Sequence, residues 1–469
     1  MGGRSSMRMS CAVIAAWTAI GCAEHRSLEP EGAAGGSAKP MSSQSSPKPR
    51  GNTGDKPAAG NLDDGTAPQN QRETPVPTPF VPSDPSSAAA DNCTIPVKTD
   101  KLDLLFMVDN SGSMAQEQAA LREQFPKLIS ILASGDPGAG RQKFPPINDL
   151  HLGVVSSDLG LVGINDIDKC AGLGDDGVMQ NEPRMQGCMA SYPRFLTYNA
   201  GLNTPAEVAN DFACIAMLGT DGCGFEQPLE TTLKALWPGN DDRIKFLGDA
   251  NNFGLQGHGD AENQGFLRND VDRGLSLIAV VVVTDEDDCS SQNTGHFTPN
   301  AYLDPTNPED ARLLTQGLNV RCHANPQNLF AIERYVAALR ALRPGRENMV
   351  LFTAIVGVPP ETVDANAVAE AGSGDASERA KFYENILAHP SMQPVVDPRG
   401  TPDPQDDTMT PSCNTSSGLA YPPRRIVEVA RGFGANGMVQ SICREDFGPA
   451  VDTIIRVIGQ RLANSDCVD

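Results

Sequence analysis

The sequence is poor in basic residues and, beyond its N-terminal region, lacks an apolar run long enough to cross a membrane. Lys and Arg number 37 against 59 Asp and Glu, which gives a formal net charge of -22. Nucleic-acid binding needs basic patches that neutralise phosphates, so this balance argues against it. The apolar run Leu275–Val283 is too short for a transmembrane helix. The acidic excess suits a soluble, exported, cation-binding protein, or serves solubility alone.

Several signatures of catalysis are also missing from the sequence. There is no Cys-x-x-Cys pair and no His-Glu-x-x-His, which argues against zinc held by thiolates or by a metalloprotease helix. There is no Gly-x-Ser-x-Gly elbow, no phosphate-binding loop and no Gly-x-Gly-x-x-Gly after a strand. We therefore expect a binding protein rather than an enzyme.

Residues 1–21 have the layout of a signal peptide. Two arginines precede an apolar core at residues 11–20 that is too short to span a bilayer. The tetrapeptide Ala-Ile-Gly-Cys that ends at Cys22 resembles a bacterial lipobox. This resemblance implies lipidation of Cys22 and, because Ala23 follows, an outer-membrane lipoprotein. The alternatives are ordinary signal cleavage near Ala23 and an internal start.

Residues 22–92 are predicted to form a disordered tether. They are rich in Pro, Ser, Gly and Ala and contain few large apolar side chains. Such a segment cannot bury enough surface to offset the entropy of ordering it. As a random coil, about seventy residues reach about 40–50 Å. The folded domain is expected at residues 93–469.

Cysteines are numerous enough to suggest disulfide bonds. Of 12 cysteines, Cys11 lies in the signal peptide and Cys22 is the candidate lipid site, which leaves ten. An even number in an exported chain predicts disulfides rather than zinc. The ten candidates are Cys93, Cys170, Cys188, Cys214, Cys223, Cys289, Cys322, Cys413, Cys443 and Cys467.

One pairing is favoured over the others. Cys93 and Cys467 flank the folded region, and a bridge between them would close a very long loop, which the chain-entropy model makes strongly stabilising. Proximity in sequence gives the weaker expectations Cys170–Cys188 and Cys214–Cys223.

Short apolar runs alternate with amphipathic helical patterns along the folded region. This alternation predicts an α/β fold with a mostly parallel central sheet and helices on both faces, a Rossmann-type three-layer arrangement. Insertions are expected at residues 159–192 and 360–422, and Pro126 should kink or restart its helix. The predicted strands are residues 102–108, 150–155, 195–198, 275–283, 349–358 and 438–442, and the predicted helices are residues 116–133, 206–218, 227–236, 327–342, 424–431 and 447–462.

Oxygen-bearing side chains directly follow two of these strands. The first strand runs into Asp109-x-Ser111-x-Ser113, and the fourth is followed by Asp285. Parallel sheets bind ligands beyond the carboxyl ends of their strands, and such side chains suit a hard cation. The alternatives are an ordinary polar turn after the first strand and a solvated acidic loop at Asp285–Asp288.

The order of elements and these motifs resemble the von Willebrand factor type A domain over almost all of residues 93–469. The resemblance implies a metal-ion-dependent adhesion site built from three loops. The Asp-x-Ser-x-Ser motif matches the first loop, and Thr284-Asp285 matches the third, where Glu286 replaces the usual Gly. The second loop usually supplies a Thr. Here Glu226 falls nearest that position, with Thr220 as the alternative.

The resemblance also implies a function. The site would bind Mg²⁺, or else Mn²⁺ or Ca²⁺, and an open coordination position would accept a carboxylate from a protein partner. The chain would then be a cation-dependent adhesion module on the cell envelope, with membrane contact through its lipid anchor only. The alternatives are a metal-dependent hydrolase that uses the Asp109 and Asp285 carboxylates, and a structural envelope protein with a degenerate metal site.

Overall fold

The computed structural model describes residues 99–248, 255–415 and 418–463. The predicted signal peptide, the lipid site Cys22, the tether at 22–92 and the Cys93–Cys467 bridge lie outside these residues. Within the described ranges, no helix has both the length and the apolar character needed to cross a membrane.

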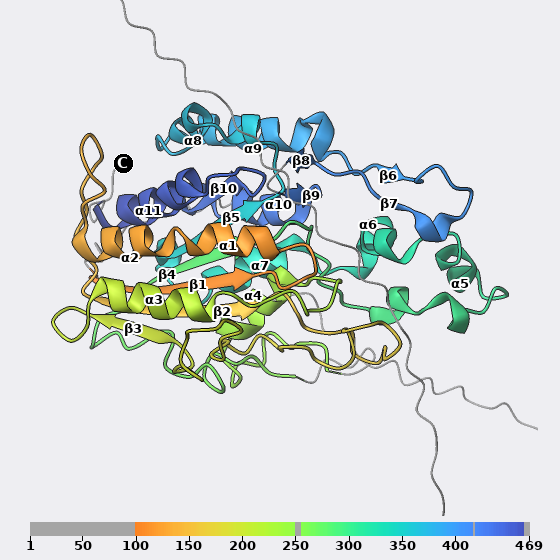
Figure 1. Cartoon of the computed structure of the whole chain (residues 1–469), viewed down its shortest axis with the longest axis horizontal. Coiled ribbons are helices and arrows are strands. Elements are labelled where there is room, and N and C mark those ends of the chain that lie inside the picture. Colours follow the sequence, from red (N-terminus) through yellow and green to blue (C-terminus); the bar gives the residue numbers. More distant parts are fainter. Residues whose placement is uncertain (1–98, 249–254, 416–417, 464–469) are drawn as a thin grey trace, which may run out of the picture. The chain divides into compact units, whose positions relative to one another are not determined.

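A six-stranded sheet forms the centre of the described domain (Figure 1). Its strands are β1 (Lys101–Val108), β2 (Asp149–Ser156), β3 (Leu196–Asn199), β4 (Leu277–Val283), β5 (Val350–Val356) and β10 (Gly437–Ser441). In space their order is β10-β5-β4-β1-β2-β3, and all neighbours are parallel except β2 and β3. The predicted mostly parallel sheet, with a short strand at its edge, is confirmed.

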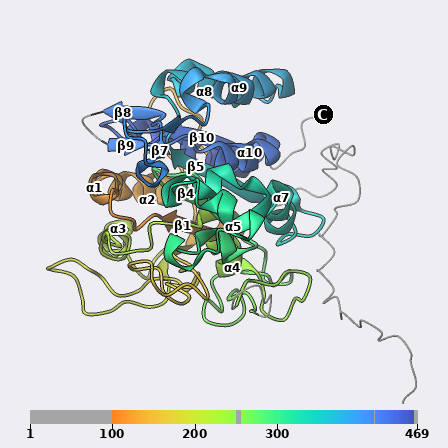
Figure 2. The ribbon, with the colours of Figure 1, turned by 90° about the vertical axis from the view of Figure 1, so that its right-hand side faces the viewer.

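Helices cover both faces of this sheet (Figure 2). They include α1 (Ala115–Arg122), α2 (Phe125–Ser134), α3 (Pro205–Ile215), α4 (Pro228–Leu236), α7 (Ile332–Arg340), α10 (Arg424–Gly432) and α11 (Gly448–Ala463). On one face α2 packs against α3 and α11, and on the other α7 packs against α4 and α10. The α/β class predicted from the alternation of strands and helices is therefore correct.

Local sequence explains the main elements. All seven residues of β4, Leu-Ile-Ala-Val-Val-Val-Val, are buried, as expected for a central strand covered on both faces. Pro126 lies in the first turn of α2, where its missing N–H costs no hydrogen bond. The helix expected at 116–133 is therefore two helices. The second ends at Gly135, which adopts a left-handed conformation with φ of 67°.

A buried ion-pair network occupies the amino end of the sheet. Asp103 interrupts the apolar pattern of β1 and is fully buried. Its Oδ1 accepts a hydrogen bond from Arg268 Nε at 2.7 Å, and its Oδ2 accepts one from the Arg268 backbone N–H at 2.9 Å. Arg343 Nη2 lies 3.8 Å from Oδ2, and the Ser276 hydroxyl also donates to it. This carboxylate is compensated entirely by the protein.

Three segments interrupt the alternation of strands and helices. Residues 159–192 contain no helix and a single isolated β-bridge, in keeping with the insertion predicted there. Residues 360–422 include α8 (Ala365–Ala371), α9 (Ala376–Ala388) and two hairpins, β6 (Val396–Asp397) with β7 (Thr408–Met409) and β8 (Cys413–Thr415) with β9 (Gly418–Ala420). A third insertion, which the sequence did not predict, holds α5 (Pro308–Leu313) and α6 (Arg321–Ala324), and the helix expected from 327 begins only at Ile332.

Disulfides tie the insertions to the sheet domain, but two expected pairings are wrong. Cys170–Cys188 and Cys214–Cys223 do not form, because the first insertion lies against a segment made of the last turn of α3 and the loop that follows it. Each cysteine of one segment therefore faces a cysteine of the other, with Cα–Cα distances of 4.6 and 5.9 Å. The bridges within the described residues are Cys170–Cys223, Cys188–Cys214, Cys289–Cys322 and Cys413–Cys443.

Candidate metal centre

The direction of the chain reverses at the middle of the sheet. From β1 the chain continues to β2 on one side, whereas from β4 it continues to β5 on the other. In open α/β sheets such a reversal opens a crevice beyond the carboxyl ends of the strands, where ligands bind. Asp109 and Asp285 directly follow β1 and β4, and the Asp109 N–H donates to the Val283 carbonyl at 2.9 Å. Both predicted carboxylates thus lie at this switch point.

Only neutral groups hold the carboxylate of Asp109, which is fully buried. Its Oδ1 accepts hydrogen bonds from the Ser111 N–H at 2.8 Å and the Ser157 hydroxyl at 3.1 Å. Its Oδ2 accepts one from the Thr284 hydroxyl at 2.6 Å. The Ser111 contact closes a turn that aspartate favours at this spacing. Burial raises the pKa of Asp109 despite these donors.

The loop between α3 and α4 is held against the Asp109 loop. The Gly222 N–H donates to the Asn110 carbonyl at 2.9 Å. Gln118 Nε2 donates to the carbonyls of Asp109 at 2.7 Å and Gly219 at 2.9 Å. A Cβ at Gly222 would collide with the Asn110 side chain, so this close approach requires glycine. These contacts bring the end of the loop, just before α4, to the switch point.

Glu226 lies at that end of the loop and is 6% exposed. Burial, and then the charge of Asp109, raises the pKa of Glu226 well above its ordinary value, while a hydrogen bond with Ser111 lowers it. For Thr220, the alternative, the carbonyl accepts from Lys169 Nζ at 3.4 Å. Within the described ranges its side chain makes no hydrogen bond to the first or third loop. The structure thus brings Glu226, and not Thr220, to the other predicted ligands.

Asp285 is 1% exposed, and its Oδ1 has no hydrogen-bond partner. Burial first, and then the charge of Asp109, raises the pKa of Asp285 to about 7, while a hydrogen bond with Ser113 lowers it. Ser113 is exposed, and its hydroxyl lies 3.4 Å from that of Ser111. A buried acceptor without a donor is costly, so a cation at this position would satisfy a group that the protein leaves unsatisfied.

Two further glutamates enlarge the site. Glu117 on α1 is 3% exposed, its Oε2 has no hydrogen-bond partner, and burial raises its pKa. Burial, and then the charge of Glu226, raises the pKa of Glu286 well above its ordinary value. We call these five carboxylates, Asp109, Glu117, Glu226, Asp285 and Glu286, the acidic cluster. Among the described residues, no Lys, Arg or His forms an ion pair with any of its members.

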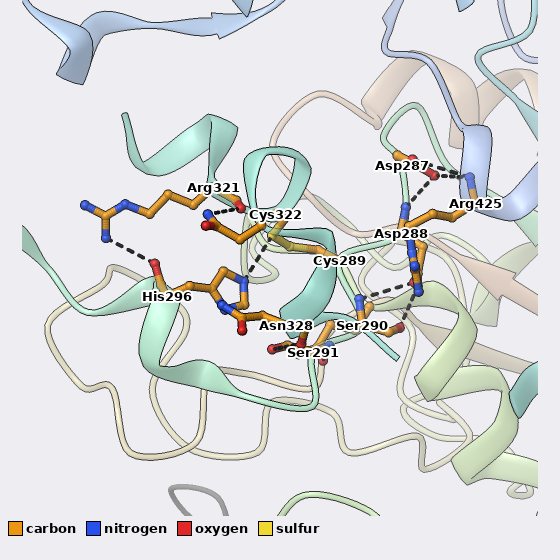
Figure 3. The surroundings of a disulfide bond; sticks show 12 residues. Asp287, Asp288, Cys289, Ser290, Ser291, His296, Arg321, Cys322, Asn328 and Arg425 are labelled. Carbon is orange, nitrogen blue, oxygen red and sulfur yellow. Dashed lines mark hydrogen bonds and ion pairs between the residues drawn. A yellow bond between two sulfur atoms is a disulfide. The ribbon is translucent and has the colours of Figure 1, made fainter. Parts of the chain in front are cut away.

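The next two acidic residues both contact Arg425 (Figure 3), although burial still raises the pKa of Asp287 to about 7. Arg425 Nε lies 3.1 Å from Asp288 Oδ2, and the Arg425 backbone N–H donates to Asp287 Oδ1 at 3.0 Å. Asp288 Oδ1 also accepts from the Leu229 N–H at 3.0 Å, at the start of α4. The alternative of a solvated acidic loop is wrong, because Asp285 and Asp288 are 1% and 2% exposed.

A separate sulfur and nitrogen group lies in the insertion after β4 (Figure 3). The ligand atoms of Cys289, His296 and Cys322 lie within 4.8 Å of one another, and His296 Nε2 is 3.8 Å from Cys322 Sγ. Metals bind thiolates, and here both sulfurs form a disulfide. This group does not suit Mg²⁺, which prefers oxygen ligands.

The predicted ligands are not packed as tightly as that group. Asp109, Glu226 and Asp285 do not place carboxylate oxygens within 4.8 Å of one another, the spacing at which Cys289, His296 and Cys322 stand out among the described residues. A cation between them would therefore be reached partly through hydroxyls and water, which Mg²⁺ retains readily.

Sequence reasoning named five members of this arrangement and missed one. It named Asp109, Asp285, Glu226 and the two serines, and it noted Glu286 without a role. It missed Glu117, although the position of this residue four places after Ser113 sets it on the first turn of the following helix. No protein-family model and no curated protein matches the chain.

Proposed function

We propose that residues 93–469 form a von Willebrand factor type A-like domain that binds a divalent cation at the acidic cluster and, through it, a protein partner. The observation that carries the proposal is the partnerless Oδ1 of buried Asp285, in a cluster of five carboxylates without a positive charge. Elsewhere in the domain, buried carboxylates such as Asp103 have arginine partners.

The ligands in this proposal are those of three loops. Ser111 and Ser113 would bind the ion through their hydroxyls, and Asp109, Glu226 and Asp285 would neutralise its charge directly or through water. Mg²⁺ is the expected ion, and Mn²⁺ would fit the same ligands. Ca²⁺ takes more oxygen ligands than Mg²⁺, so Glu117 and Glu286 would favour it.

Access from solvent supports binding of a partner. Ser113 is exposed while Ser111, Asp109 and Asp285 are buried, so the site is accessible to solvent at Ser113. A partner carboxylate that approaches from this side would complete the coordination of the ion. In this role the cluster only binds the ion and, through it, the partner. The proposed function is therefore adhesion rather than catalysis.

The proposed setting is the cell envelope. Four disulfides in the described residues are compatible with export into an oxidising compartment. In this proposal Cys22 carries the lipid, the tether spans the distance from the membrane, and the outer membrane is the expected location.

A paired binding experiment tests the proposal. The full chain, freed of metal by chelator, is titrated with Mg²⁺, Mn²⁺ and Ca²⁺, and envelope proteins are then captured on it with and without chelator. Asp109→Ala should abolish both cation binding and capture, whereas Asp272→Asn, an exposed acid outside the site, should change neither. Capture that is unchanged in Asp109→Ala would contradict adhesion through this site.

A metal-dependent hydrolase is the second candidate. One observation favours it, since a carboxyl with a pKa of about 7, as at Asp285, is suited to general-base catalysis at neutral pH. Against it, Asp288 is paired with Arg425 and Asp287 accepts a hydrogen bond from the Arg425 backbone N–H, so both carboxylates are already engaged within the protein. Turnover of a generic phosphoester that is lost in Asp285→Asn would favour this candidate. A chain that binds no divalent cation would instead be a structural protein with a degenerate site.

A further inference from the structure

A cavity of about 320 Å³ lies at the opposite end of the sheet from the acidic cluster. Its walls are the connection between α8 and α9, the amino end of β10 and the last turns of α11. Figure 1 shows α8, α9 and α11 on the β10 side of the sheet. The volume suits a small ligand.

Among the described residues, the cavity is lined by three arginines and by no acidic residue. They are Arg379 on α9 and Arg456 and Arg461 on α11, together with Gln142, Asn436 and Gln460. This composition is unusual for a chain with a net charge of -22. A local excess of guanidinium groups in an acidic protein calls for a specific cause.

Two of these guanidinium groups have hydrogen-bonding capacity that the protein leaves unused. Arg379 Nη1 and Arg456 Nη2 are both buried atoms and have no hydrogen-bond partner in the part of the chain that the structure describes. Neither Arg379 nor Arg456 takes part in an ion pair among the described residues. Burial lowers the pKa of Arg456, as expected for a guanidinium removed from water without a compensating charge.

The position of Arg456 is built into the fold. Its Nη1 donates to Gln460 Oε1 at 3.2 Å, one turn along α11. The guanidinium lies so close to Gly372 that a Cβ there would collide with it. Gln460 Nε2 in turn donates to the Gly372 carbonyl at 3.2 Å. The glycine turn after α8 thus accommodates a half-buried guanidinium group.

We propose that this arginine cavity is a binding site for a small oxyanion, either a phosphate or a carboxylate group, that bridges Arg379 and Arg456. The planar guanidinium fork matches both groups, with two parallel N–H donors for two oxygens. An oxyanion here would supply acceptors to the two buried nitrogens and neutralise the positive charge of the half-buried guanidinium groups. This site lies apart from the acidic cluster, and its ligand is an anion rather than a cation.

Calorimetric titration of the full chain tests this proposal, with inorganic phosphate in one series and succinate in another, at constant ionic strength set by chloride. We expect saturable binding to one site in at least one series, and the better ligand distinguishes phosphate from carboxylate. Arg456→Gln should weaken that binding by about tenfold or more, because it removes charge-assisted hydrogen bonds. Arg273→Gln, whose side chain is 85% exposed, is the matched control and should bind as the wild type does.

A second variant distinguishes a loss of oxyanion binding from a loss of folding. Ser373 lines the cavity and is exposed, so Ser373→Glu places a carboxylate beside the arginines without disturbing the core. It should abolish oxyanion binding while the thermal unfolding midpoint stays within a few degrees of the wild type. Asp285→Asn should leave oxyanion binding intact. Absence of saturation by both anions, or wild-type binding in Ser373→Glu, would overturn the proposal.

Discussion

The two ends of β1 carry buried aspartates in opposite electrostatic settings. At the amino end, Asp103 is held by Arg268 and Arg343, so its charge is balanced within the protein. At the carboxyl end, six residues along the chain, Asp109 is equally buried but receives only neutral donors and lies among further carboxylates. The first is a closed structural network, whereas the second has no counter-charge among the described residues, which is what the proposed cation site requires.

Removal of Asp103 should have the largest effect on stability. Asp103→Ala leaves Arg268 and Arg343 buried without their counter-charge, and breaking a buried pair in this way costs about 3–5 kcal/mol. Urea unfolding of the full chain in chelator should show a much lower midpoint. An unchanged midpoint would show that the amino-end network does not stabilise the fold.

The pH dependence of stability should be the next largest effect, and it comes from Asp285, at the carboxyl ends of the strands. The pKa of Asp285 is raised from 3.8 to about 7, so the folded protein holds a proton that the unfolded chain has released. In chelator, this group should therefore make the free energy of unfolding fall by about 4 kcal/mol as pH rises from 4 to 8. Saturating Mg²⁺ should reduce this fall, because the ion replaces the proton. Stability in chelator that rises over the same range would contradict the account.

Removing the negative charge of Asp285 should stabilise the metal-free protein. At pH 8 in chelator, Asp285→Asn removes a charge that burial and Asp109 disfavour, and unfolding should require about 1–2 kcal/mol more. Added Mg²⁺ should then raise the thermal midpoint of the wild type but not that of the variant. Asp272→Asn, an exposed aspartate outside the cluster, is the control and should respond to Mg²⁺ as the wild type does.

The smallest effect on stability is expected at the mouth of the site. Ser113 is exposed, so Ser113→Ala should change the free energy of unfolding in chelator by less than about 0.5 kcal/mol. It should nevertheless weaken Mg²⁺ binding, because a predicted ligand is lost. Urea unfolding and calorimetric titration of Mg²⁺ on the same sample separate the effect on stability from the effect on binding. Equal Mg²⁺ affinity in the variant would remove Ser113 from the ligand set.

The sequence predicted the sheet and both strand ends of the site because these depend on local signals. A continuous apolar run such as Leu277–Val283 can be recognised directly in the sequence as a buried strand. A residue that directly follows a parallel strand must lie at the carboxyl end of that strand. The restart of the helix at Pro126 is local as well.

Features that depend on contacts between distant segments could not be predicted. The disulfides of Cys170 and Cys188 join the loop before α4 and the last turn of α3, because the path of the first insertion is set by tertiary packing. The acidic run at 285–288 is divided between the cluster and Arg425, an arginine 137 residues beyond Asp288. The third insertion was not predicted, so the helix expected at 327–342 was predicted to begin too early. It begins at Ile332.

The most direct measurement is a calorimetric titration of Mg²⁺ into the metal-free full chain and into Asp285→Asn. If the carboxyl end of the sheet is a cation site, the wild type binds one ion and the variant binds none or binds it far more weakly. Equal binding by the two proteins, or no binding of Mg²⁺, Mn²⁺ or Ca²⁺ by the wild type, would contradict the account.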